Sequence, residues 1–258
     1  MEWYLVLAAI GAGFVAGFIN TLAGSGSLVT LPMLIFMGLP ATVANGTNRV
    51  AILLQNLVAV ESFRREGVLD WRGALVFGGP AVLGSVVGAQ IAVNLDEAMM
   101  QRVIGVLMLV MLLVIVLRPR RWLHGVLERF EGRPSALQLL IFFGIGLYGG
   151  FIQAGVGIFL LAGLVLGAGY NLVRANAVKV GIVFFFTISA LVVFVRNDQV
   201  NWLMGGIVAI GNMLGAYLAT KVAVERGVVW VHRLLIVVVV VSALNLLGIF
   251  DLIGRFFG

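Results

Sequence analysis

The chain has 258 residues, of which 62% are hydrophobic and only 11% are charged, and its mean hydropathy is +1.13. Soluble domains carry about a quarter charged residues, so this composition excludes an ordinary soluble protein and predicts an all-α polytopic membrane protein. At roughly 20 residues per helical span, the chain accommodates up to about ten hydrophobic segments and leaves no room for a separate soluble domain.

The charge and the rarer residue types exclude further functions. The net charge is +6, but most arginines fall in short loops, where the positive-inside rule places them, so nucleic acid is not an expected partner. The chain has no cysteine, which excludes disulfides, thiolate metal sites and cysteine nucleophiles. Both histidines, His124 and His232, fall in connectors, and we expect no metal or other cofactor. The N-terminus lacks the basic region of a signal peptide, so we expect the first segment to be retained.

Apolar runs separated by helix breakers predict two similar halves. Each half holds five segments, of which the second is short. The predicted segments span residues 3–19, 27–36, 44–63, 73–93 and 99–117 in the first half, and 136–152, 158–166, 172–195, 202–222 and 229–250 in the second. We therefore divide the chain into a first transmembrane repeat (1–117), a basic connector (118–135) and a second transmembrane repeat (136–258).

An internal sequence repeat supports this division. Adding 131 to a residue number aligns much of the first half with the second without a gap. The matched pairs include Gly24 with Gly155, Gly26 with Gly157, Asn45 with Asn176, Trp71 with Trp202, Gly84 with Gly215 and Arg102 with Arg233. Apolar matches are common by chance in such a chain, so the repeat depends on these Gly, Asn, Trp and Arg pairs.

Loop charge predicts how the two repeats are oriented. If the basic connector is cytoplasmic, alternate crossings place every strongly basic loop on that side of the membrane. The equivalent loops of the two halves, 64–72 and 196–201, then lie on opposite sides. An odd number of crossings in each half makes the repeats inverted, an arrangement that many secondary transporters share, with binding near the membrane midplane.

The first two segments of each half have two interpretations. Either both segments cross the membrane, or they form a re-entrant hairpin that turns at residues 20–26 and at residues 153–157. The short segments provide about ten residues, or roughly 15 Å of helix, which does not span a hydrocarbon core of about 30 Å. We favour short helices whose ends meet at mid-depth.

Two glycine-rich sequences precede the short segments, AGSGS at 23–27 and AGVG at 154–157. A helix N-terminus presents free N–H groups and a partial positive charge, and glycine lets an anion approach the backbone. We therefore predict an anion site between the two helix starts. Its expected ligands are Asn20, Thr21, Gly24, Ser25, Gly26 and Ser27 from the first half and Gln153, Gly155 and Gly157 from the second.

Other glycines have a simpler interpretation. Pairs of small residues four positions apart let two helices pack closely in a membrane. We assign this packing role to Gly13 and Gly17, Gly84 and Gly88, Gly146 and Gly150, and Gly211 and Gly215.

A polar cluster begins the third segment of each half. Asn45, Asn48 and Arg49 project from one helix face, as do Asn176 and Lys179. Each cation either snorkels to the membrane interface, the ordinary position of a cation near a helix end, or faces the site. A planar guanidinium suits an oxyanion of sulfur, phosphorus or carbon. We include these five residues among the expected substrate ligands.

The residues inside the other segments agree with an anionic substrate. No Asp or Glu lies well inside any predicted segment, so a cation pathway or a carboxylate proton relay has no obvious carrier. Gln55, Asn56 and Asn212 lie in mid-segment and either line the pathway or join helices by hydrogen bonds.

With these motifs identified, the first stretch, GFINTLAGSGSLVTLPMLIFMGLPATVANGTNRVA at 17–51, closely resembles the first-repeat motif of the TauE/SafE sulfite exporter family, also called the toluene-sulfonate uptake permease superfamily. The similarity continues through GGFIQAGVGIFLLAGLVLGAG and RANAVKV and covers essentially the whole chain. The resemblance implies a permease without catalysis that moves sulfite, sulfonates or related small anions. Gln153 departs from the family pattern, which usually has glycine or alanine before the glycine of the second motif, and this departure leaves the ligand preference open.

The sequence features predict a multi-pass protein of the cell inner membrane that is a secondary transporter of a small anion by alternating access, and the resemblance implies an exporter of sulfur-containing or organic anions. The alternatives are an anion channel and an intramembrane serine hydrolase. The hydrolase would use Ser25 as nucleophile, with Lys179 as the only candidate base. The expected partners are the small anion, membrane lipid and a coupling ion, H⁺ or Na⁺, and the sequence is compatible with a homo-oligomer.

Overall fold

The structure is a computed structural model that describes residues 2–117 and 132–225. The described residues form helices joined by short turns, which confirms the predicted all-helical class. In chain order these are α1 (Trp3–Ala23), α2 (Ser27–Phe36), α3 (Ala41–Arg65), α4 (Trp71–Val93), α5 (Glu97–Leu117), α6 (Ala136–Phe151), α7 (Val156–Ala162), the π-helical turn η2 (Gly163–Gly167), α8 (Leu172–Arg196) and α9 (Trp202–Glu225).

Within the described ranges, these helices follow the first nine predicted segments. Helix α2 is short, as predicted, and η2 continues α7. Helices α1, α4, α8 and α9 are long and apolar enough to cross a membrane by length and composition. Helix α3 is also long enough, but its polar residues make its mean hydropathy lower than that of these four helices. The tenth predicted segment, 229–250, and residues 118–131 of the connector lie outside the described residues.

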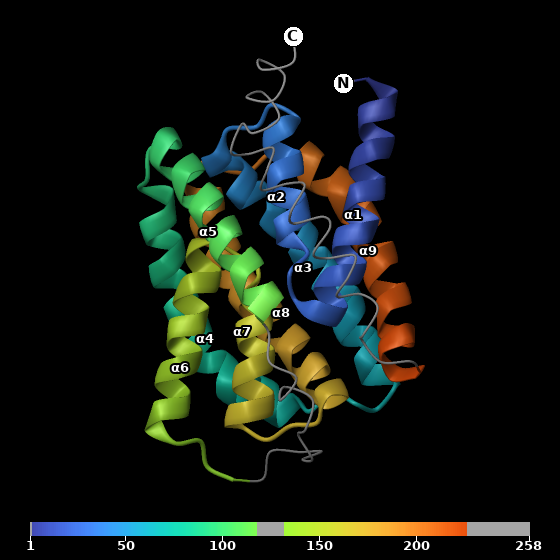
Figure 1. Ribbon diagram of the computed structural model, residues 1–258, viewed down its shortest axis with the longest axis vertical. Helices are drawn as coiled ribbons and strands as arrows, with labels where there is room; N and C mark the ends of the chain where they lie inside the picture. Colours follow the sequence, from blue (N-terminus) through green and yellow to red (C-terminus); the bar gives the residue numbers. More distant parts are fainter. Residues whose placement is uncertain (1, 118–131, 226–258) are drawn as a thin grey trace.

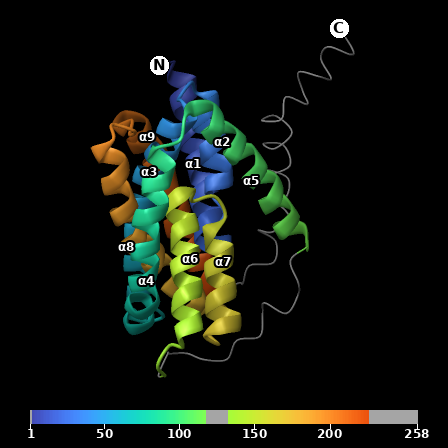
Figure 2. The same cartoon turned by 90° about the vertical axis from the view of Figure 1, so that its left-hand side faces the viewer.

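Helices α1 and α2 form one hairpin, and α6 and α7 form a second. Helix α1 begins at the end of the molecule that carries the N-terminus, whereas α6 begins at the opposite end (Figure 1), and the view from the side agrees (Figure 2). The two turns meet, because the Gly157 N–H donates a hydrogen bond of 3.0 Å to the Gly24 carbonyl. Two opposed hairpins are compatible with an inverted repeat, and the repeat itself stays a prediction.

The two turns share one backbone feature. Gly24 has φ +76° and Gly155 has φ +75°, values in the left-handed region that favours glycine because it has no Cβ. The sequence offset pairs these same two glycines. The turn geometry therefore explains why both motifs contain glycine at this position.

The glycine pairs assigned to packing bring helices of the two halves into backbone contact. A Cβ on Gly13 or Gly17 of α1 would collide with α9, and one on Gly146 of α6 would collide with the backbone of Ala81 on α4. The remaining members of the four pairs make equivalent contacts: Gly211 and Gly215 with α1, Gly84 and Gly88 with α6, and Gly150 with α4. The packing interpretation of these glycines is confirmed.

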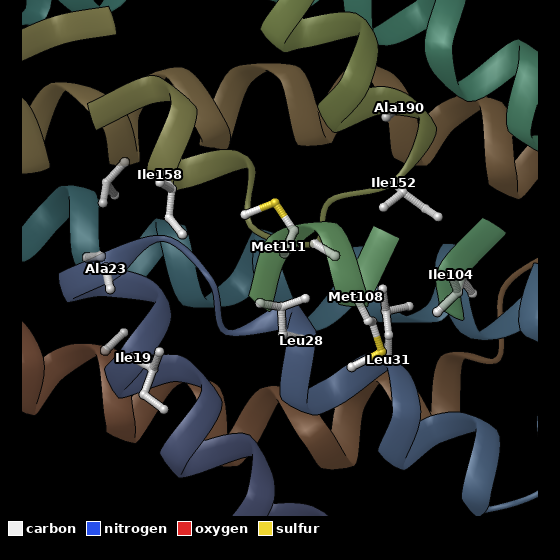
Figure 3. Close-up of a cluster of buried hydrophobic side chains, with 14 of the residues drawn as sticks. Ile19, Ala23, Leu28, Leu31, Ile104, Met108, Met111, Ile152, Ile158 and Ala190 are labelled. Carbon is white, nitrogen blue, oxygen red and sulfur yellow. The ribbon is translucent and has the colours of Figure 1, made fainter. Parts of the chain in front are cut away.

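Helix α5 covers the place where the turns meet. Its Met111 belongs to the same core cluster as Leu28 and Leu31 of α2 and Ile152 of the second turn (Figure 3). A Cβ on Gly155 would overlap the Met111 side chain. Met111 of α5 thus lies directly against the second turn and belongs to the same apolar cluster as the start of α2.

Substituting one glycine of α6 tests this packing against a matched control. We expect Gly146→Ala to lower the melting temperature of the detergent-solubilised protein, because overpacking a close contact costs about 1–3 kcal/mol. Gly144 lies in the same helix with open space around its Cβ position, so Gly144→Ala should be neutral or stabilising, since alanine is the better helix former. Equal melting temperatures for the two variants would contradict the packing role.

Candidate functional site

The polar residues predicted to bind the substrate gather around the meeting point of the two turns. Apart from Asn20, which is partly exposed, every one of them is buried. The buried polar members are Thr21, Ser25, Ser27, Asn45, Asn48, Arg49, Gln153, Asn176 and Lys179. Polar side chains at membrane depth are tolerated only where protein or a water-filled cavity surrounds them. This cluster is therefore the candidate functional site.

Arg49 of α3 binds the C-terminal end of α6. Its Nη1 donates to the Gly149 carbonyl at 3.0 Å and its Nη2 to the Gly150 carbonyl at 2.6 Å. The guanidinium carbon also lies 4.5 Å from the centre of the Phe194 ring on α8. The side chain is completely buried, so the snorkelling interpretation is wrong for Arg49. A cation at this position neutralises the partial negative charge of a helix C-terminus.

Lys179 of α8 binds the C-terminal end of α1 in the same way. Its Nζ donates to the carbonyls of Asn20 at 3.2 Å and Thr21 at 2.9 Å, and to Asn176 Oδ1 at 2.6 Å. The Asn176 amide donates in turn to the Leu22 carbonyl at 3.3 Å. Lys179 is also buried, so it does not snorkel either.

The two cation contacts are reciprocal between the halves of the chain. A residue of α3, in the first half, binds the end of α6 in the second, and a residue of α8 binds the end of α1. Each cation has an asparagine beside it that binds the same helix end, since Asn45 Nδ2 donates to the Phe151 carbonyl at 2.9 Å. The first hairpin of each half is thus held by the third helix of the other half.

Side-chain hydrogen bonds also fix the first turn. Asn48 Nδ2 donates to Ser27 Oγ at 3.1 Å, and Thr30 Oγ1 donates to Asn48 Oδ1 at 2.5 Å. The Gly26 N–H donates to Asn20 Oδ1 at 3.3 Å. These bonds attach the start of α2 to α3 and occupy one of the N–H groups that we expected an anion to use.

The two turns have equivalent contacts with the third helix of their own half. Asn20 Nδ2 donates to Gln55 Oε1 at 3.1 Å, and Gln153 Nε2 donates to Thr187 Oγ1 at 2.6 Å. Thr187 was not among the predicted site residues. The repeat offset, which pairs Thr187 with Asn56, is the signal that indicates it.

The polar residues in mid-segment had two possible roles in the sequence analysis above, and in the structure they join helices or bond to their own backbone. Asn212 Nδ2 of α9 donates to Gln55 Oε1 at 3.3 Å, so these two residues connect α9 to α3. Asn56 Nδ2 donates to the Ile52 carbonyl of its own helix at 2.8 Å.

The space expected between the two helix starts is closed in this conformation. A Cβ on Gly24 would collide with the Gly157 backbone, and the reverse substitution would collide with Gly24. The Gly157 N–H is occupied by the Gly24 carbonyl. Because neither glycine has a side chain, the two turns touch directly, and no solute fits between these two residues here. The predicted anion site therefore does not lie directly between Gly24 and Gly157 in this conformation.

Three buried groups of the site have unused hydrogen-bonding capacity. Ser25 Oγ, Arg49 Nε and Gln153 Oε1 have no hydrogen-bond partner within the described part of the chain. An unsatisfied buried polar group costs about 1–3 kcal/mol, so groups of this kind are uncommon without a role. The serine hydroxyl and the guanidinium N–H are donors suited to an oxyanion, whereas the amide oxygen is an acceptor.

The site does not have the contacts of a serine hydrolase. A serine nucleophile needs a base within hydrogen-bond reach, and among the described residues Ser25 Oγ has no such partner. Lys179, the candidate base, instead donates to Asn176 and the end of α1.

Neither a metal cluster nor a described surface groove coincides with the site. Within residues 2–117 and 132–225, no group of three or more His, Asp or Glu side chains is placed to hold a metal ion. Grooves of about 300 Å³ between α1 and α2 and about 430 Å³ between α3 and α9 have no polar residue of the site in their lining.

A multi-pass helical protein whose interior carries cations and amides around two opposed hairpins has the features of a membrane transporter. A profile of the sulfite exporter TauE/SafE family matches residues 9–246, and the chain belongs to this family. It is a multi-pass protein of the cell membrane.

Relatives that are named as probable membrane transporters support the assignment to this class of protein. A probable membrane transporter protein of Sinorhizobium is 27% identical over 96% of this chain and 94% of its own length. A probable membrane transporter protein of Haemophilus influenzae is 27% identical over 87% of this chain and 88% of its own. One of Escherichia coli is 26% identical over 90% of this chain and 86% of its own. No solved structure matches the chain.

Removing the cation tests the contact with the helix end. We expect Arg49→Gln to lower the melting temperature, because the last carbonyls of α6 lose their donors and unsatisfied buried groups cost about 1–3 kcal/mol each. Arg102→Gln is the control, since Arg102 is exposed on α5. Thermal unfolding in detergent measures both variants. Equal melting temperatures for Arg49→Gln and Arg102→Gln would contradict the role of Arg49 in holding the end of α6.

Proposed function

We propose that this protein is a secondary transporter of small sulfur-containing or organic anions, such as sulfite or sulfonates, that works by alternating access. The family description favours export. The assignment of Asn20, Thr21, Ser25, Ser27 and the other predicted ligands to substrate binding belongs to this proposal, as do the coupling ion and the use of Arg49 and Lys179 as anion-binding cations.

The observation that carries the proposal is the charge balance at Arg49. A guanidinium keeps its full positive charge, and the helix end that it contacts supplies about half a negative charge. In the described part of the chain its hydrogen bonds go to backbone carbonyls and to Asn45, not to a carboxylate. Part of the positive charge is therefore left without compensation in a low-dielectric interior, where an anion is the favoured ligand.

The unpaired groups extend this preference to a chemical type. Ser25 Oγ and Arg49 Nε can both donate to an oxyanion. Gln153 Oε1 can only accept, so it favours an anion that also carries a donor, such as hydrogen sulfite or a sulfonate with a hydroxyl group. A fully deprotonated inorganic oxyanion leaves this acceptor unsatisfied.

Ser25→Ala is the most informative variant for this proposal. The hydroxyl has no partner among the described residues, so its removal should leave the fold intact, whereas losing a hydrogen bond to the substrate should weaken transport about 3- to 10-fold. Saturable uptake of labelled sulfite, which includes hydrogen sulfite near neutral pH, and of 2-hydroxyethanesulfonate into proteoliposomes measures the effect.

Ser62→Ala is the matched control, because Ser62 bonds Thr220 away from the turns and its loss should leave flux unchanged. Unaltered flux in Ser25→Ala would remove this hydroxyl from the mechanism. A wild-type protein without saturable anion flux would contradict the transporter proposal, and steady single-channel conductance would favour a channel.

A further inference from the structure

The helices pack into two groups that cut across the two halves of the sequence. Helix α1 makes its most extensive contacts with α9, and α4 makes its most extensive contacts with α6. Helix α3 also packs on α9, and α4 also packs on α8. Consecutive helices α3 and α4 share almost no contact, and neither do α8 and α9. We name the two groups the α9 body (α1, α2, α3 and α9) and the α4 body (α4, α6, α7 and α8).

Contacts within each body are close and rigid. The glycine pairs place α1 against α9 and α4 against α6 with their backbones touching, a geometry that leaves no slack for one helix to slide past another. Hydroxyl pairs add to it: Ser62 of α3 lies 2.8 Å from Thr220 of α9, and Ser85 of α4 lies 2.6 Å from Ser189 of α8. Each of these contacts joins the first half of the sequence to the second.

Contacts between the bodies include the polar ones of the functional site. Arg49 and Asn45 of the α9 body bind the end of α6, and Lys179 and Asn176 of the α4 body bind the end of α1. The bond from Gly157 to Gly24 also crosses between the bodies. A cation that binds carbonyls can exchange them for an anion of similar geometry. The contact of Gly24 with Gly157 joins two turns at a single point, whereas the glycine contacts inside each body repeat along a pair of helices.

Two short connectors join the bodies covalently. They are residues 66–70, between α3 and α4, and residues 197–201, between α8 and α9. Each contains one residue in the left-handed region, Gly67 at φ +67° and Asp198 at φ +54°, and the repeat offset pairs these two positions. Hinges are a few such loop residues that absorb changes in φ and ψ.

Helices α3 and α8 make the most extensive contact between the two bodies. We propose that the bodies that move during transport are the α9 body and the α4 body, each built from both halves of the sequence, and that they rock about this α3–α8 contact. The inference rests on the proposed transport function. Rocking in one direction separates Arg49 from the end of α6, and rocking in the other separates Lys179 from the end of α1. The released cation then binds the anion in place of the carbonyls.

Disulfide cross-linking tests this assignment directly, because the chain has no cysteine of its own. The double variants are Ser62→Cys with Thr220→Cys and Ser85→Cys with Ser189→Cys. The paired hydroxyl groups are close enough for a disulfide to replace each pair. Each disulfide ties the two sequence halves together but stays inside one body. We expect no loss of anion flux on oxidation, even in the quadruple variant that carries both bridges.

Loss of flux on oxidation, restored by a reductant, would overturn the proposal, because it would mean that the sequence halves move as units. Titration of free thiols establishes that the bridges have formed. Absence of flux from the wild-type protein and the reduced variants would instead contradict the proposed function. Hydrogen exchange then decides the body assignment: the Gly157 amide, which crosses between bodies, should exchange faster than the amides of Gly211 and Gly146, and equal rates would overturn it.

Discussion

The structure depends on a buried cation that binds the C-terminal carbonyls of a helix ending inside the protein. Helices α1 and α6 both stop where the two turns meet, and a helix end leaves carbonyls without partners and a partial negative charge, which is costly away from water. Lys179 satisfies the end of α1 and Arg49 the end of α6. The short helices α2 and α7 can begin at this depth because the preceding ends are stabilised in this way.

The same contacts link the proposed binding of an anion to the proposed movement of the two bodies. Each cation reaches from one body to a helix end of the other, so the bodies cannot separate on that side without releasing a charge into the interior. A negatively charged solute is the ligand that compensates such a charge. The closed contact between Gly24 and Gly157 then corresponds to a conformation in which the carbonyls, and not a solute, hold the cations.

Much of the fold was predictable from the sequence, whereas the partners of its polar residues were not. Hydropathy located the helices, and the pairing of Gly24 with Gly155 indicated two equivalent turns, because only glycine takes a left-handed conformation without strain. Helical spacing also placed Asn45 and Arg49 on one face. The carbonyls that Arg49 binds lie about one hundred positions away, and no local pattern specifies a contact at that distance. The direct approach of the two turns likewise depends on tertiary packing, since glycine permits both a tight contact and an open cradle.

If the buried positive charge of the site binds an oxyanion, the anion should stabilise the folded wild-type protein, and the melting temperature measures this stabilisation. At constant ionic strength, hydrogen sulfite or 2-hydroxyethanesulfonate should raise the melting temperature relative to chloride, because a ligand at 100 times its Kd stabilises the folded state by about 2.7 kcal/mol. Dimethyl sulfone, which has similar oxygens and no charge, should have no effect. An equal shift with the neutral sulfone, or no shift with any oxyanion, would contradict oxyanion binding by the buried cations.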